Sequence, residues 1–326
     1  MDMALSSSEN PAIFVSRRDS EELLAAIARR TAHPRAGIFG PDSVSWKINR
    51  ESALFLGAGR AALLQLAHPW VAEALAQHST LLSRPIARFH RTFCIVFTMI
   101  FGTLDQALKA ARHLHELHEQ VQGEMPAEVA AYRRGSHYAA NEVAALRWVF
   151  ATLVESAVLA YECVLPPLTQ PERETYYAES RTLAGLFGIP AGALPENWVS
   201  FSAYVGQMCE SEVLGVSTTA RTMAHSLLAG AGSWIRPPHW YRALTAQWMP
   251  ARFREEFALD FRVTDERAAE RARRWLPGVY RRLPLRVRFA GPWQEAGARL
   301  DNRPAGALIR ASNRFWIGRP RLPFCE

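Results

Sequence analysis

Apolar residues recur at helical spacing along nearly the whole chain. In the segment 107–121, Ala107, Ala111, Leu114 and His118 follow one another at steps of four, three and four, which places them on one helix face. Helices are predicted on this basis over residues 20–30, 49–68, 84–102, 103–122 and 141–163, with further helices up to about residue 283. No run shows the strict alternation typical of strands. The pattern therefore predicts an all-α protein.

Polar and helix-breaking residues set the expected helix ends. Thr103 is a good N-cap, and Gly123 is the expected end of the helix that it begins. Gly102 is a stop signal for the preceding helix, and Asn141 is the expected cap of the long apolar helix that follows. Pro69 should end or kink the helix before it.

The length of 326 residues and the apolar fraction of 49% suit one large helical domain. We expect a flexible N-terminus over residues 1–18, the helical domain over 19–308 and a loose C-terminal tail over 309–326. The longest apolar run, residues 148–165, is interrupted by Glu155 and Glu162 and is predicted to be a buried helix rather than a membrane span. No secretory signal is visible.

Charge is unevenly distributed along a chain of net charge +7. Residues 232–326 hold 19 Arg, no Lys and 9 Asp or Glu. The chain contains only two lysines, Lys47 and Lys109, so we interpret the arginine richness as compositional. Nucleic acid is not expected as a partner. Peripheral membrane contact through the basic C-terminal part is possible but not expected, and it stays as a weaker alternative. The four cysteines are far apart, as in a reduced cytoplasmic protein.

A glycine motif lies in the segment 53–69. Gly57, Gly59 and Ala62 form G-x-G-x-x-A, the spacing of a dinucleotide-binding turn. That turn needs a preceding strand and a carboxylate about 20 residues later, and neither is present. We therefore expect the small residues to permit close approach of a second helix or a flat cofactor.

Three histidines share the predicted helix after Thr103. His118 lies on its apolar face, His113 on the polar side, and His115 on the border between them. A core histidine is more often structural than a ligand, so helical spacing leaves both roles open for His118. Zinc is disfavoured because no further ligands occur at a suitable spacing.

A second polar group lies on the predicted helix over 84–102. Arg88, Arg91 and Thr92 share one face among apolar neighbours, so they need an anionic partner. One interpretation is an interhelical salt bridge to Glu73 or Glu155, and the other is a cofactor carboxylate.

Glu155 is itself unusual because it lies inside the long apolar helix. A carboxylate there is either paired or raised in pKa. Pairing with Arg147 or Arg91 is preferred here to a role as a catalytic base.

Four segments, taken in order, resemble the family of MpaB-type oxygenases and latex-clearing proteins (rubber oxygenases). They are the opening region "GIFGPDSVSWKINRESALFLGAGRAALLQLAHPWVAEALAQHS", the basic-Thr motif "RFHRT", the segment "HEQVQG" and the core helix "YAANEVAALRWVFATLVES". Together they cover about half of the chain. Phe150 stands where relatives commonly have His.

The resemblance implies an all-helical domain that encloses a pocket for one haem b, with His118 as the proximal ligand of the iron. It places Arg88, Arg91 and Thr92 on the haem side or in the distal pocket. A lysine of this motif can cap the iron in latex-clearing proteins, but Arg91 stands there and guanidinium is a poor iron ligand. The general base is placed only approximately, at Glu73.

The expected function is a haem-dependent oxygenase that uses O2 on an apolar, alkene- or terpenoid-like substrate, with oxidative cleavage of a C=C bond. Arg91, Thr92 and Glu73 are then the candidate catalytic residues. The alternative is a non-catalytic protein that binds haem or an apolar ligand. The sequence does not specify the substrate or the oligomeric state.

Overall fold

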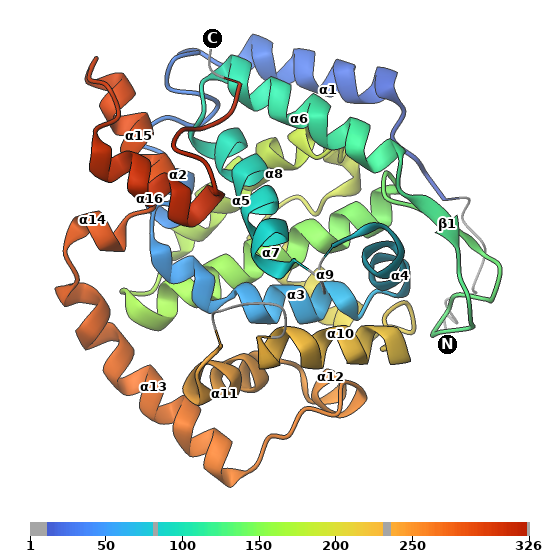
Figure 1. Ribbon diagram of the computed structural model, residues 1–326. Coiled ribbons are helices and arrows are strands. Elements are labelled where there is room, and N and C mark those ends of the chain that lie inside the picture. Colours follow the sequence, from blue (N-terminus) through green and yellow to red (C-terminus); the bar gives the residue numbers. More distant parts are fainter. Residues whose placement is uncertain (1–11, 81–83, 231–235, 325–326) are drawn as a thin grey trace.

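The computed structural model describes residues 12–80, 84–230 and 236–324, and these fold almost entirely into helices (Figure 1). Within these ranges there are 16 α-helices, two short 3-10 helices and one two-stranded sheet, which confirms the predicted all-α class. The α-helices are α1 (Arg17–Arg30), α2 (Val44–Asn49), α3 (Ala58–Leu66), α4 (Pro69–His78), α5 (Pro85–Phe101), α6 (Leu104–Glu119), α7 (Val143–Val164), α8 (Gln170–Leu186), α9 (Trp198–Glu210), α10 (Thr218–Ala229), α11 (His239–Trp248), α12 (Ala251–Glu256), α13 (Val263–Arg282), α14 (Leu285–Arg288), α15 (Gly291–Leu300) and α16 (Ala307–Ile317). The 3-10 helices are η1 (Ser52–Leu56) and η2 (Ala191–Ala193).

The helix ends follow local capping chemistry. The Thr103 hydroxyl accepts from the Gln106 amide while the Gln106 side chain accepts from the Thr103 amide, so a capping box begins α6. Pro69 and Pro85 occupy the first positions of α4 and α5, where a missing N–H costs nothing. Gly102 ends α5, as predicted. Each device starts or stops a helix without help from tertiary packing.

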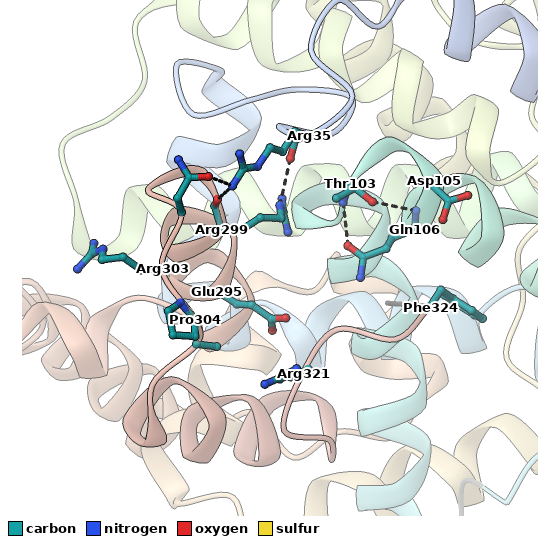
Figure 2. A pocket seen from close by; sticks show the side chains of 12 residues that line it. Arg35, Thr103, Asp105, Gln106, Glu295, Arg299, Arg303, Pro304, Arg321 and Phe324 are labelled. Carbon is teal, nitrogen blue, oxygen red and sulfur yellow. Dashed lines mark hydrogen bonds between the residues drawn. The ribbon is translucent and has the colours of Figure 1, made fainter. Parts of the chain in front are cut away.

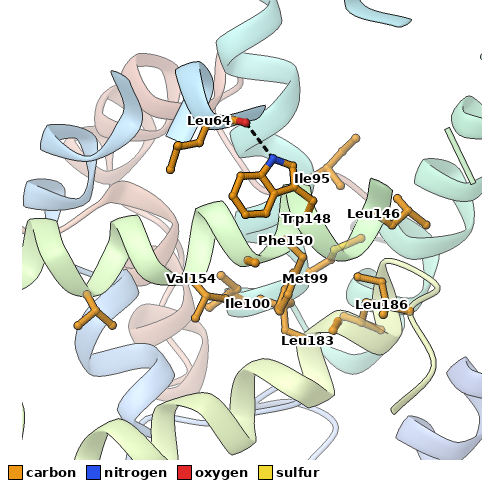
Figure 3. Packing of buried hydrophobic residues seen from close by; sticks show 14 of the residues in the cluster. Leu64, Ile95, Met99, Ile100, Leu146, Trp148, Phe150, Val154, Leu183 and Leu186 are labelled. Atoms are coloured by element: carbon orange, nitrogen blue, oxygen red, sulfur yellow. Dashed lines mark hydrogen bonds between the residues drawn. The ribbon is translucent and has the colours of Figure 1, made fainter. Parts of the chain in front are cut away.

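Helix α7 is the central element of the core. It packs against α3, α13, α2, α8 and α9. It is long and apolar enough to cross a membrane, but 61% of its most apolar window is buried against the surrounding helices. Around it Trp148 and Phe150 lie among aliphatic side chains of α3, α5 and α8, and the Trp148 indole N–H donates to the Leu64 carbonyl at 2.8 Å (Figure 3).

The segment predicted as one helix over residues 49–68 is divided into α2, η1 and α3. Helix α6 ends at Glu119 rather than Gln122, because the chain turns into strand β1 (Gln122–Glu124), which pairs antiparallel with β2 (His137–Ala139). Glu142, not Asn141, caps α7 by accepting from the Ala144 and Ala145 amides. The spacing of apolar residues did not predict these helix ends, because they depend on the geometry of the turns and of the hairpin.

The structure differs from both of the expected loose ends. Residues 1–11 lie outside the described residues, but the Val15 amide donates to the Asn141 carbonyl, and Val15 is buried. Residues 307–317 form α16, which packs against α15 and α5 (Figure 1). The expectation of a loose tail from residue 309 is wrong over this helix, because α16 buries Asn313 and Ile317 as it packs against α15 and α5.

Candidate functional site

His118 lies in the last turn of α6, immediately before the β1–β2 hairpin. The residue is half-buried, and its Nδ1 is enclosed without a hydrogen-bond partner in the described part of the chain. Burial, with smaller contributions from the nearby positive charge of Arg88 and from His115, lowers the pKa of His118 to about 4. The imidazole is therefore neutral at physiological pH, which is the form that can ligate a metal.

Arg88 lies in the first two turns of α5, close enough to act electrostatically on His118. Its Nη1 donates to the Thr92 hydroxyl at 3.2 Å, and that hydroxyl donates to the Arg88 carbonyl at 3.0 Å. Burial lowers the pKa of the Arg88 guanidinium, and the charge of Arg91 adds to the effect. The predicted grouping of Arg88 with Thr92 on one face is therefore present.

Arg91 is exposed, whereas Arg88 and Thr92 are half-buried. Within residues 12–80, 84–230 and 236–324, no carboxylate forms an ion pair with either arginine. The alternative of a salt bridge from these arginines to Glu73 or Glu155 is therefore wrong. A half-buried guanidinium without an anion is costly, so Arg88 is a candidate binding group for an anionic ligand.

Glu155 pairs with Arg60, at 2.5 Å, and not with Arg147 or Arg91 as expected. Arg147 instead donates to the Tyr204 hydroxyl and to the Ala193 carbonyl. The sequence spacing did not reveal this pairing because Arg60 lies on α3, 95 residues earlier in the chain. Glu155 is therefore part of the packing between α3 and α7.

Glu73 is 5% exposed on α4, and its helix packs against β2. Its charge adds to the burial that raises the pKa of Tyr138 on that strand. The Tyr138 hydroxyl donates to the Gln77 side chain at 2.8 Å. Glu73 is thus a buried carboxylate near the hairpin that begins just after His118, without an ion pair among the residues described.

The histidines of α6 are ordered differently from the expectation. His115, predicted at the border, is the most buried at 7% exposed, and it lies 3.3 Å from the Glu119 carboxylate. His113 is exposed, as predicted. His118 is only half-buried as a residue because α6 ends there, although its Nδ1 is enclosed.

Sequence reasoning missed a group of polar side chains around α4. His68 is 1% exposed, burial lowers its pKa to about 4, and its Nε2 lies 3.2 Å from the Tyr132 hydroxyl. Three enclosed atoms on or beside α4 have no partner in the ranges described: His68 Nδ1, Trp70 Nε1 and Ser79 Oγ. Apolar periodicity could not reveal them, since His68 and Trp70 merely flank Pro69.

Gly57 and Gly59 permit close helix packing, as predicted from their small size. A Cβ at Gly57 would lie 2.5 Å from the Ser156 carbonyl oxygen on α7, and one at Gly59 would lie 2.7 Å from the Thr245 hydroxyl on α11. The segment before them is the 3-10 helix η1 and not a strand. A phosphate-binding turn is therefore excluded here.

Two surface cavities lie away from His118. One, of about 620 Å³, is lined by Thr103 and Asp105 at the start of α6, by Glu295 and Arg299 of α15 and by Phe324 (Figure 2). His118 is at the other end of α6, a helix of 16 residues. The second cavity, of about 600 Å³, lies beside the Arg60–Glu155 pair. His118, Arg88, Thr92 and Glu73 line neither of these cavities.

The structure brings His118, Arg88 and Thr92 together and leaves Arg91 at their solvent side. A neutral imidazole can take a metal ion through one nitrogen, while the adjacent guanidinium can take an acidic group. No group of three or more His, Cys, Asp or Glu side chains suited to a metal ion occurs in the described ranges. A single neutral imidazole beside a guanidinium is a donor set that fits an ion held mainly by its own organic frame, with one protein ligand.

Comparison with known proteins gives one match. The family model described as "ER-bound oxygenase mpaB/B'/Rubber oxygenase, catalytic domain" matches residues 46–278. No curated protein and no solved structure matches the chain. The matched range contains α3 to α12 and most of α13, and therefore all five candidate side chains, His118, Arg88, Arg91, Thr92 and Glu73.

Proposed function

Because the chain belongs to the ER-bound oxygenase mpaB/B' and rubber oxygenase catalytic-domain family, we propose that it is a haem b-dependent oxygenase. It uses O2 on an apolar, alkene- or terpenoid-like substrate and cleaves a C=C bond oxidatively. Family membership supports the broader class of oxidoreductase. The observation that supports the haem assignment is the neutral imidazole of His118, whose enclosed Nδ1 has no hydrogen-bond partner among the described residues. Arg88 lies nearby and pairs with no carboxylate in the same ranges.

In this proposal His118 would ligate the haem iron, and Arg88 would bind a carboxylate of the cofactor. Thr92 orients Arg88 through the 3.2 Å hydrogen bond. Haem b, when bound, supplies the iron chemistry that activates O2. Arg91, exposed at the edge of the group, adds positive charge that favours the same carboxylate.

The remaining residues would hold the substrate and move protons. Phe93 and Val96 of α5 and Leu114 and Leu117 of α6 are partly buried and pack against the core, and in this proposal they would supply apolar contacts to the substrate. Glu73, buried on α4, is the candidate proton acceptor. All the side chains given a role in this proposal lie within the described residues.

The first test measures haem binding to purified protein by absorption after haem-supplemented expression. We expect a Soret band that is lost in His118→Ala and retained in His113→Ala, because His113 is exposed on the same helix and points elsewhere. Arg88→Met should weaken haem loading without unfolding the apo-protein, since it removes a half-buried charge that has no carboxylate partner among the described residues. Absence of a Soret band in the unaltered protein would overturn the assignment.

The second test separates an oxygenase from a haem-binding protein without catalysis. O2 uptake by the reduced protein is measured after addition of an apolar alkene such as a terpenoid. Uptake with formation of carbonyl products supports the proposal, and Glu73→Gln should slow it while leaving the Soret band unchanged. A haem-loaded protein that consumes no O2 with any such alkene is a binding protein instead.

A further inference from the structure

One stretch of the chain combines an extreme charge with exposed apolar side chains. Residues 271–290 contain seven arginines and no Asp or Glu. They form the second half of α13, then α14 and the turns on either side, along one edge of the molecule (Figure 1). We call the exposed residues of this stretch the arginine edge.

Carboxylates neutralise little of this charge. Arg288 is paired with Glu51, and Arg274 lies 3.9 Å from Glu270 in a pair that is largely solvated. Arg281 and Arg282 donate to backbone carbonyls of their own helix, which leaves their charges in place. The arginine edge is therefore a strongly positive surface.

Large apolar side chains protrude among these arginines. Trp275 is 41% exposed, Val279 49%, Leu285 60% and Val287 56%. These four are among ten large hydrophobic residues described as exposed in the structure, and they fall within 13 consecutive positions. Isolated exposed apolar residues are ordinary, but a group of them within a cationic stretch marks an interaction surface.

We propose that the arginine edge binds the surface of an anionic lipid bilayer. Its arginines pair with lipid headgroups, and Trp275, Val279, Leu285 and Val287 enter the boundary between headgroups and acyl chains. This combination of cationic and aromatic or aliphatic side chains is typical of interfacial membrane binding. The surface adds to the haem proposal and is independent of it, because α14 is far along the chain from His118 and shares none of its groups.

Other partners fit the same surface less well. Nucleic acid would pair with the arginines but would leave Leu285 and Val287 in water, because its backbone offers phosphate and sugar. A two-fold contact with a second copy would bring the arginines of one copy against those of the other. The sequence alone favoured a compositional origin for the arginines, and the exposed apolar side chains change that interpretation.

The test is flotation of the full-length protein with vesicles of phosphatidylcholine alone, or of phosphatidylcholine mixed with phosphatidylserine. We expect co-flotation with the mixed vesicles at low salt, and weaker binding at about 0.5 M NaCl, where charges are screened over a few ångströms. Arg281→Gln/Arg282→Gln should weaken partitioning on the order of tenfold, since each arginine near a charged membrane contributes substantially. Leu285→Ser/Val287→Ser should weaken it to a similar extent.

Matched variants elsewhere provide the controls. Arg29→Gln/Arg30→Gln on α1 makes the same change in net charge, and Val199→Ser removes an apolar side chain that is 63% exposed on α9. Neither should change flotation.

All altered side chains are exposed, so the unfolding midpoints of the variants should be unchanged. If Leu285→Ser/Val287→Ser does unfold, Arg281→Gln/Arg282→Gln alone decides the test. No flotation at low salt, or equal flotation of edge and control variants, overturns the proposal. The proposal is also overturned if the protein does not bind vesicles and the edge variants instead lose dimer formation or nucleic-acid binding.

Discussion

Two histidines of this protein are held neutral by the same physical cause. In the described part of the chain, His68 and His118 each have an enclosed Nδ1 without a hydrogen-bond partner, and burial is the main cause that lowers the pKa of each to about 4. Protonation in place would put an unpaired positive charge in an apolar environment. For His118 this favours ligation of a metal, and for His68 it makes the fold itself sensitive to acid.

The pH dependence of stability should reveal His68. Its folded pKa is below the ordinary value of 6.5, so the unfolded chain binds more protons and stability falls as the pH drops from 6.5 toward 4. The loss attributable to His68 should be about 2 kcal/mol at pH 5. Urea unfolding of apo-protein at pH 7 and pH 5 measures it.

The control for this prediction is His68→Gln. The quantity compared is the change in the free energy of unfolding between pH 7 and pH 5, and not the absolute stability of the variant. The variant should lose about 2 kcal/mol less than the unaltered protein over that interval. Part of the acid sensitivity should persist, because His118 is still present. An equal loss in both proteins would show that His68 is protonated in the folded state.

Residue identity alone could not rank the histidines of α6. The apolar period correctly placed His113 in solvent and gave His118 an inward direction. His115 is nevertheless the most buried of the three, and α6 ends at Glu119, where the chain turns into the antiparallel pair of β1 and β2. The position of a residue in the helical repeat predicts the direction of its side chain around the helix axis. The burial of that side chain also depends on which other elements pack on that side.

At the scale of elements, close packing of α3 against α7 and α11 explains the glycine motif. Gly57 caps α3 and lies directly against the α7 backbone at Ser156. A main-chain carbonyl cannot move aside as the end of a long side chain can. Addition of even one methyl group at Gly57 should therefore destabilise the fold.

Gly57→Ala should therefore destabilise the protein by about 2 kcal/mol. The matched control is Gly297→Ala in the middle of α15, where an added Cβ meets nothing within 4 Å. That substitution should stabilise by up to about 1 kcal/mol, because alanine is the better helix former. Thermal or urea unfolding of the two variants measures the difference, and equal effects would argue against the close approach of α3 and α7.

Most helices could be predicted from the sequence, whereas several of their joints could not. Thr103, Gly102 and Pro69 mark boundaries through local chemistry that needs no partner. The division at η1 and the hairpin after Glu119 depend on contacts with distant segments, such as the Ala53 amide that donates to the Tyr280 hydroxyl. In the candidate site, the grouping of Arg88 with Thr92 followed from spacing, but the Arg60–Glu155 pair did not.

At the scale of the whole molecule, α16 returns the end of the chain to its beginning. Trp316 stacks on Phe55 of η1 with ring centroids 4.3 Å apart, and Phe55 also contacts Phe89 and Phe93 of α5. Glu295 of α15 accepts from the Asn313 side chain. The last helix thus closes over the element that carries Arg88 and Thr92.

Trp316→Ala should lower the free energy of unfolding by about 2 kcal/mol or more, since it removes a large ring packed on the core. Phe315→Ala is the matched control on the same helix, because Phe315 is 55% exposed and should change stability by no more than about 0.5 kcal/mol. Urea unfolding measures both. If the C-terminal tail were loose, as the sequence suggested, neither substitution would change the free energy of unfolding. If α16 is packed on the core, only Trp316→Ala should lower it substantially. If Trp316→Ala also weakens haem loading, the closing helix supports the start of α5 as well as the core.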